Sequence, residues 1–173
     1  MNPLVQLREY GQSPWYDYIR RGLITSGELK ALIDEDGLMG VTSNPSIFEK
    51  AIAGSTDYNQ ALKQIASDVT GVKQIYEALA IRDIQDAADL MHPVYEQTAA
   101  RDGYVSLEVS PHLAFNTDAT IEEAQRLHKA IGRDNVMIKV PATAEGLPAI
   151  EHLLSLGINV NVTLLFSVDM YER

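Results

Sequence analysis

Short apolar runs alternate with longer amphipathic segments along most of the chain. Five runs are rich in β-branched and aromatic residues and predict strands. They occupy residues 13–19, 38–44, 104–111, 135–143 and 158–166. Between them, apolar residues recur every three to five positions, which is typical of helices that cover a sheet. The pattern therefore predicts an α/β protein built from repeated strand–helix units.

Capping residues and glycines mark where the predicted helices begin and end. The helices are expected at residues 25–34, 46–54, 56–100, 118–132, 144–157 and 167–173. Asn44-Pro45-Ser46 ends the second strand and starts the next helix. Asp118 or Thr120 is the expected N-cap of the helix at 118–132, and Gly132 is its expected stop. Because strand and helix alternate, we expect parallel strands joined by crossover helices.

The position of the polar residues distinguishes two ways of arranging such a sheet. A doubly wound sheet carries its ligand site at a glycine-rich first turn, and no such motif follows the first strand here. Polar residues lie within the strands instead, which favours a TIM-type (β/α) barrel. Only about the first five βα units fit into this sequence, whereas a complete barrel has eight. We expect residues 1–173 to be the N-terminal part of a single (β/α)8 barrel domain, truncated after strand 5, with an exposed sheet edge.

Composition excludes several kinds of partner. A formal charge of −10 opposes binding to nucleic acid, and no apolar run approaches the roughly 18 residues of a membrane span. The chain has no cysteine, so disulfides and thiolate metal sites are excluded and a cytoplasmic location is expected. The four histidines show no paired metal-ligand spacing, so no metal is expected. The oligomeric state is left open.

Lys139 is an unusual residue, because it stands inside the apolar strand NVMIKVPAT. Burial disfavours an ammonium ion and increases the share of neutral amine, which attacks carbonyl carbons to form a Schiff base. The resulting iminium ion accepts the electrons of a breaking carbon–carbon bond, which is aldolase chemistry without a metal. A lysine that extends to solvent at the end of a strand is the plainer alternative, and it stays open at this point.

Two carboxylates are candidates for the proton transfers that such chemistry needs. Glu108 lies on the strand YVSLEVSP and is suited to relay protons through a water, and Asp17 is suited to remove a hydroxyl proton. The alternatives are an ion pair between Glu108 and Lys139 and pairing of Asp17 with Arg20 or Arg21. Neither carboxylate is specific on its own.

Amides and hydroxyls on the neighbouring strands complete a polar set. Alternation places Asn161 and Thr163 on one face of their strand, where buried polar groups require partners. Asn44 precedes a proline, so a simple turn role is its alternative. If Lys139 points the same way as these residues, an amine, carboxylates and amides converge on one concave site near the strand ends.

Five blocks of sequence together resemble the transaldolases over nearly the whole chain. They are WYDYIRR, GVTSNPSIFEKAI, VSLEVSP, MIKVPAT and GINVNVTLLFS. The resemblance is closest to the longer bacterial branch, including forms fused to a phosphoglucose isomerase. It implies a class I (β/α) barrel enzyme of the pentose phosphate pathway that moves a dihydroxyacetone unit and needs no cofactor. Its partners would be sugar phosphates: a ketose donor such as fructose 6-phosphate or sedoheptulose 7-phosphate, and an aldose acceptor.

The same resemblance implies roles for four catalytic residues. Lys139 resembles the Schiff-base lysine, and Glu108 the acid and base that acts through water. Asp17 resembles the base of the cleavage step, and Thr163 the residue that holds the catalytic water.

The resemblance also implies that Asn44 and Asn161 bind substrate. Their neighbours Ser43 and Thr42 are weaker candidates for the same role. The serine and arginines that bind phosphate in transaldolases follow later strands, and residues 1–173 contain no counterpart. Two alternatives therefore stand beside a transaldolase. One is a related class I aldolase that releases free dihydroxyacetone, and the other is a catalytically silent fragment that needs a partner chain to complete the barrel.

Overall fold

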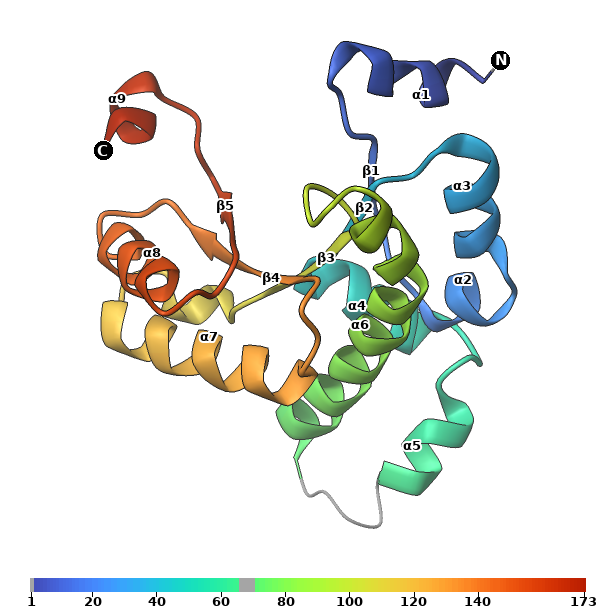
Figure 1. The fold of residues 1–173 in the computed structure, drawn as a ribbon. Helices are drawn as coiled ribbons and strands as arrows, with labels where there is room; N and C mark the ends of the chain where they lie inside the picture. The colour runs from blue at the N-terminus through green and yellow to red at the C-terminus, as the bar shows by residue number, and fades with distance from the viewer. Residues whose placement is uncertain (1, 66–70) are drawn as a thin grey trace.

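The fold is given by a computed structural model that describes residues 2–65 and 71–173. Within these residues, five strands form one sheet in which every neighbouring pair is parallel. The strands are β1 (Trp15–Asp17), β2 (Gly40–Thr42), β3 (Tyr104–Glu108), β4 (Val136–Pro141) and β5 (Val160–Thr163). Figure 1 shows the strands at the centre and the helices around them.

Helices precede the first strand, connect each strand to the next and follow the last one. They are α1 (Pro3–Gln6), η1 (Leu7–Tyr10), α2 (Arg21–Thr25), α3 (Glu28–Asp36), α4 (Pro45–Gly54), α5 (Asn59–Ile65), α6 (Val72–Gln97), η2 (Pro111–Leu113), α7 (Thr117–Ile131), α8 (Gly146–Ser155) and α9 (Val168–Glu172). Across the described part of the chain, no helix is both long enough and apolar enough to cross a membrane.

The strand order separates the two arrangements of a parallel sheet. The strands lie side by side in the order of the sequence, from β1 at one edge to β5 at the other. A doubly wound sheet would reverse its order at a switch point. Crossovers of one hand in a sequential sheet place the helices on the same side, as in a barrel. The sheet is thus a partial (β/α) barrel, and the predicted fold class is confirmed.

The side of the sheet that faces the helices forms the hydrophobic core. Val41, Val105 and Ile138 occupy alternate strand positions on this side and are fully buried. Ile84 of α6 and Leu127 of α7 belong to the same buried cluster. Each such side chain stabilises the fold by about 1.5–3 kcal/mol. This packing fixes the backbone from which the other side of the sheet presents its side chains.

Two short N-terminal helices were not predicted from the sequence. In α1, the Asn2 side chain accepts a hydrogen bond from the Leu4 N–H, and its amide donates to the Glu35 carbonyl at 2.9 Å. In α2, the first N–H groups are bound by side chains distant in sequence, at 3.1 Å each: Arg21 by the Tyr58 hydroxyl and Gly22 by Asp57. Tertiary contacts, rather than periodicity, therefore define both elements.

Element boundaries also differ from the prediction, and all five strands are shorter than the predicted runs. The helical region expected at 56–100 is two helices, α5 and α6, and its residues 66–70 lie outside the described part of the chain. The N-cap of α7 is Asn116, not Asp118 or Thr120, because the Asn116 side chain accepts from the Ala119 N–H at 3.0 Å. The fifth strand is shorter than expected, because Leu164 has a left-handed φ of 56° that ends the extended backbone.

Candidate active site

The register of the sheet places the predicted polar residues on one face. Residues that pair in register on parallel strands point to the same side, and directions alternate along each strand. Glu108 pairs with Lys139, and Lys139 pairs with Asn161. Seven polar residues on this side are called here the inner-face cluster: Asp17, Thr42, Ser106, Glu108, Lys139, Asn161 and Thr163. They lie opposite the apolar side that packs on the helices.

Lys139 extends into this face rather than into solvent. Only 11% of its side chain is exposed, and its Nζ donates a hydrogen bond to the Ser43 carbonyl oxygen at 2.8 Å. Ser43 follows β2, so the side chain of Lys139, which starts on β4, crosses β3 to reach it. The alternative of a lysine that extends to solvent at a strand end does not describe this geometry.

Glu108 is the nearest carboxylate to the lysine amine. Its Oε2 lies 3.8 Å from Lys139 Nζ, which is an ion-pair distance longer than a hydrogen bond. Burial raises the pKa of Glu108, the Lys139 ammonium opposes that rise, and the negative charge of Asp17 adds to it. A raised pKa brings a carboxyl group closer to the range in which it both accepts and donates protons.

Asp17 ends β1 and is exposed. The arginines that were its alternative partners are bound elsewhere: Arg20 pairs with Glu28 and Asp57, and Arg21 pairs with Asp83. Its influence on Glu108 shows that the two carboxylates are close enough to interact. Asp17 is therefore accessible to a ligand above the inner face and is not part of an ion pair within the described residues.

Ser43 and Asn161 make contacts that sequence reasoning did not anticipate. The Ser43 hydroxyl is fully buried and donates to the Ser106 carbonyl at 2.8 Å, so it is directed to the sheet rather than to a ligand. Asn161 Nδ2 donates to Ser106 Oγ at 3.2 Å. Alternation along the sequence places Ser106 on the same face as Glu108, but Ser106 was not among the predicted site residues.

Asn44 uses only one end of its side-chain amide at the start of α4. Its Oδ1 accepts hydrogen bonds from the Ile47 N–H at 2.9 Å and from the Ser46 hydroxyl at 2.7 Å, which makes it the N-cap of that helix. Its amide nitrogen has no partner within the described residues. The cap fixes the side chain and leaves the amide N–H groups available as donors.

Thr163 and Thr42 carry buried hydroxyls on the inner face. Neither Oγ1 atom has a hydrogen-bond partner among the residues that the structure describes. Buried polar atoms are normally satisfied by protein groups or by ordered water. These two hydroxyls are thus suited to bind water or ligand atoms.

A cavity of about 440 Å³ reaches Glu108 from the helix side. Leu107 and Ala80 form part of its apolar wall, and Tyr76 lies beside the carboxylate. Burial raises the pKa of Tyr76 to about 12, and nearby negative charges, including Glu108, add to the rise. The phenol therefore stays neutral at physiological pH and adds no charge next to Glu108.

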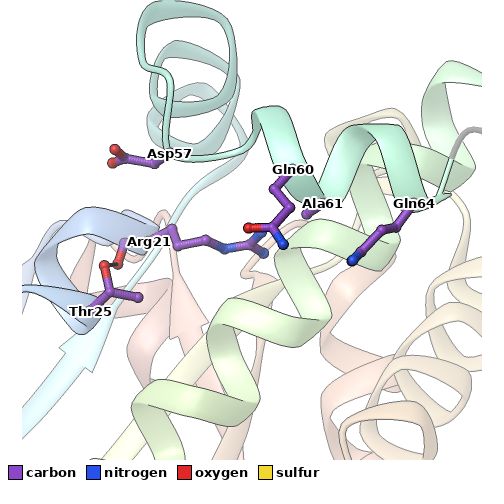
Figure 2. A pocket seen from close by; sticks show the side chains of 6 residues that line it. All are labelled: Arg21, Thr25, Asp57, Gln60, Ala61 and Gln64. Atoms are coloured by element: carbon purple, nitrogen blue, oxygen red, sulfur yellow. Dashed lines mark hydrogen bonds between the residues drawn. The ribbon is translucent and has the colours of Figure 1, made fainter.

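A separate cavity of about 420 Å³ lies between α2 and α5. Figure 2 shows the Arg21 side chain extending from α2 towards Gln60. Its guanidinium donates to Asp83 Oδ1 from Nε at 2.8 Å and from Nη2 at 2.7 Å, and the Tyr58 hydroxyl donates to Asp83 Oδ2 at 2.7 Å. None of the predicted site residues lines this cavity, and its arginine is already paired, so it is not the candidate site.

Among the described residues, no three histidine, aspartate or glutamate side chains converge as metal ligands would. The chemistry that the inner-face cluster can perform rests on its amine, its carboxylates and its hydrogen-bond donors. A buried amine beside a carboxyl group is an arrangement suited to carbonyl condensation.

Comparison with known proteins identifies related chains. The family model described as "Transaldolase/Fructose-6-phosphate aldolase" matches residues 14–173. The chain is 52% identical over 170 residues to a transaldolase of Trichodesmium erythraeum, covering 98% of this chain and 45% of that protein. It is 51% identical over 171 residues to transaldolase 2 of a Nostoc species, covering 99% and 45%.

A transaldolase of Thiobacillus denitrificans is 50% identical over 168 residues, covering 97% of this chain and 47% of that protein. The chain thus spans about half the length of the curated relatives that it matches. The match of the family model extends from just before β1 to the last residue of the sequence, and so includes every strand and all residues of the inner-face cluster. The chain belongs to the transaldolase/fructose-6-phosphate aldolase family.

Proposed function

We propose that the protein carrying this chain is a transaldolase, which transfers a dihydroxyacetone unit from a ketose phosphate to an aldose phosphate. The observation that carries the proposal is the buried amine of Lys139, 3.8 Å from the Glu108 carboxylate on the inner face of a partial barrel. The names of the similar proteins support transfer as the reaction.

The reaction begins when the neutral amine of Lys139 attacks the ketone carbon of the donor. Loss of water from the carbinolamine gives an iminium ion, which retains one N–H. Asp17 removes the proton of the hydroxyl next to the bond that breaks, the bond electrons move to the iminium, and an aldose phosphate leaves. The remaining enamine carbon then attacks the aldehyde of the acceptor, and hydrolysis frees the lysine.

Glu108 moves the protons of carbinolamine dehydration and iminium hydrolysis through a water molecule. The raised pKa of Glu108 supports this role, because the group must be protonated in one step and ionised in the other. The unpartnered, buried Oγ1 of Thr163 supports its role as the residue that holds the water.

Asn44 and Asn161 bind the hydroxyls of the dihydroxyacetone unit. The amide nitrogen of Asn44 is available while its oxygen caps α4, and Asn161 extends over the same face as Lys139. The fully buried hydroxyl of Ser43 argues against direct contact between this residue and substrate.

A related aldolase that releases free dihydroxyacetone is a second candidate, because the family that matches the chain includes fructose-6-phosphate aldolases. Incubation with fructose 6-phosphate, with and without erythrose 4-phosphate, separates the two. A transaldolase forms sedoheptulose 7-phosphate and depends on the acceptor. Release of free dihydroxyacetone at the same rate without an acceptor would contradict transfer and support the aldolase.

We also propose that residues 1–173 form the N-terminal part of a (β/α)8 domain. The sequential sheet with an open edge at β5 supports this, as does the length of the relatives. On this proposal the isolated 173 residues lack turnover, and a compact, active monomer of 173 residues would contradict it.

A cytoplasmic location stays a prediction, which the fluorescence of a tagged protein in cells would test.

A further inference from the structure

The lysine amine has a fixed acceptor that does not belong to a side chain. Lys139 Nζ donates to the Ser43 carbonyl at 2.8 Å, and this contact is buried. Glu108 lies farther away, at 3.8 Å. The direction of the amine is therefore set by a backbone oxygen at the end of β2, and anything that holds this oxygen in place also orients the amine.

Two serine hydroxyls connect this oxygen to the rest of the inner face. Ser43 Oγ donates to the Ser106 carbonyl at 2.8 Å, which ties the residue after β2 to β3. Ser106 Oγ accepts from Asn161 Nδ2 at 3.2 Å, which orients an amide of β5 across β4. Both serine residues are fully buried. The Ser43 hydroxyl thus fixes the residue whose carbonyl binds the lysine amine. The Ser106 hydroxyl fixes the amide of Asn161.

The chemistry of a Schiff base gives the Ser43 carbonyl a specific task. A primary amine has two N–H bonds when it attacks a ketone, one in the carbinolamine, and one in the iminium ion. A carbonyl that accepts from the retained N–H can do so in all three states. Its dipole also points its negative end at the nitrogen that becomes cationic, which favours the iminium.

We propose that Ser43 and Ser106 are positioning residues of the active site. Ser43 holds its own carbonyl against the nitrogen of Lys139 and so accelerates iminium formation, whereas Ser106 orients Asn161 and so strengthens donor binding. This inference rests on the proposed function. It assigns Ser43 to the lysine rather than to the substrate.

The test compares two serine variants with a matched control in the complete polypeptide. Ser43→Ala and Ser106→Ala each remove one buried hydroxyl. Thr120→Val does the same away from the site, where Thr120 Oγ1 donates to the Leu113 carbonyl at 2.9 Å. Ser43→Thr retains the hydroxyl and serves as a rescue. Thermal unfolding of each variant shows whether it is folded before kinetics are measured.

For Ser43→Ala we expect the rate of borohydride trapping at saturating fructose 6-phosphate, and kcat, to fall about tenfold with KM unchanged, since one hydrogen bond is worth about 1–1.5 kcal/mol. For Ser106→Ala we expect KM for the ketose to rise several-fold with little change in trapping rate. Ser43→Thr restores the trapping rate, and Thr120→Val leaves the kinetics unchanged.

Three results would overturn the inference. The first two are a folded Ser43→Ala protein that is trapped as fast as the unsubstituted one, and a Ser43→Thr protein as slow as Ser43→Ala. If Thr120→Val slows trapping equally, the effect is general loosening and the inference is also wrong. Failure of the proposed function itself is distinguishable, because the unsubstituted protein would then form no adduct on Lys139.

Discussion

At the scale of single residues, burial of charge determines how Lys139 and Glu108 behave. Each is mostly hidden from water, with 11% and 21% of the side chain exposed. The pair adds little to the stability of the fold, because the desolvation of buried charges offsets most of their attraction. Both residues stand out in the sequence for the same reason: each interrupts an otherwise apolar strand.

Glu108→Gln should change the dependence of stability on pH. Because burial raises the pKa of Glu108, the folded protein binds more protons than the unfolded one between the ordinary pKa and the raised value. The stability from this group is present below the ordinary pKa and is lost as pH rises through the raised one. Urea unfolding from pH 4 to 8 should show the variant gaining stability relative to the unsubstituted protein as pH rises. A constant or opposite difference would show that the pKa is not raised.

The sequence indicates which side chains belong to the candidate site, but it does not indicate which backbone groups contact them. The lysine, the two carboxylates and the amides were selected because polar residues in apolar strands are conspicuous. The carbonyl of Ser43 could not be selected, since every residue has a carbonyl and only the register of three strands brings this one to Lys139. Ser43 was accordingly assigned to substrate, whereas its hydroxyl is bound to the sheet.

At the scale of elements, helix starts and buried pairs hold the loops at the strand ends. Asn44 was expected to bind substrate, with a simple turn role as the alternative. It is the N-cap of α4, and substrate binding through its free amide nitrogen stays a prediction. The caps of α4 and α7 are chemically alike, since in both an asparagine oxygen accepts from the N–H three residues later. This likeness offers a matched comparison between one cap near the site and one away from it.

Asn44→Asp should separate capping from substrate binding. Aspartate retains the oxygen that caps α4, so the free energy of unfolding should stay within about 0.5 kcal/mol. The amide donor is lost, so kcat/KM should fall at least about tenfold. Asn116→Asp at the N-cap of α7 is the control, and it should change neither quantity. Unchanged kcat/KM in Asn44→Asp would leave Asn44 with a capping role alone.

The pairing of Arg21 with Asp83 should be the most sensitive contact between α2 and α6. These residues are 62 positions apart, so no local pattern could predict their contact. Asp83→Asn leaves a largely buried guanidinium without its counter-charge and should lower the free energy of unfolding by about 3–5 kcal/mol. Asp89→Asn, in the exposed pair with Arg133, should cost less than about 1 kcal/mol. Equal costs in urea unfolding would contradict this view of the network.

At the scale of the whole molecule, the alternation of strands and helices together with the polar residues inside the strands predicted the partial barrel. All five strands were located, and the structure shows that they lie in the order of the sequence. The short helices α1 and α2 were missed because side chains distant in sequence define them. The end of β5 was overestimated because its apolar residues continue past Thr163, where the backbone turns at Leu164.

The isolated 173 residues should associate through the region of β5 and α9. Phe166 and Tyr171 are 88% and 76% exposed, and β5 forms an unpaired edge of the sheet. Sedimentation should show a weight-average mass that rises with concentration above the 19.1 kDa of one chain. Phe166→Glu combined with Tyr171→Glu should lower it towards that value. A monomer at every concentration would contradict this prediction.

The most direct test of the account is to trap the covalent intermediate. The complete polypeptide is incubated with fructose 6-phosphate and borohydride, digested, and analysed by mass spectrometry, with Lys139→Met as the control. We predict a three-carbon adduct on the peptide that contains Lys139 and none in the control. No adduct, or an adduct on a different lysine, would contradict the central claim that the buried amine of Lys139 condenses with the ketone.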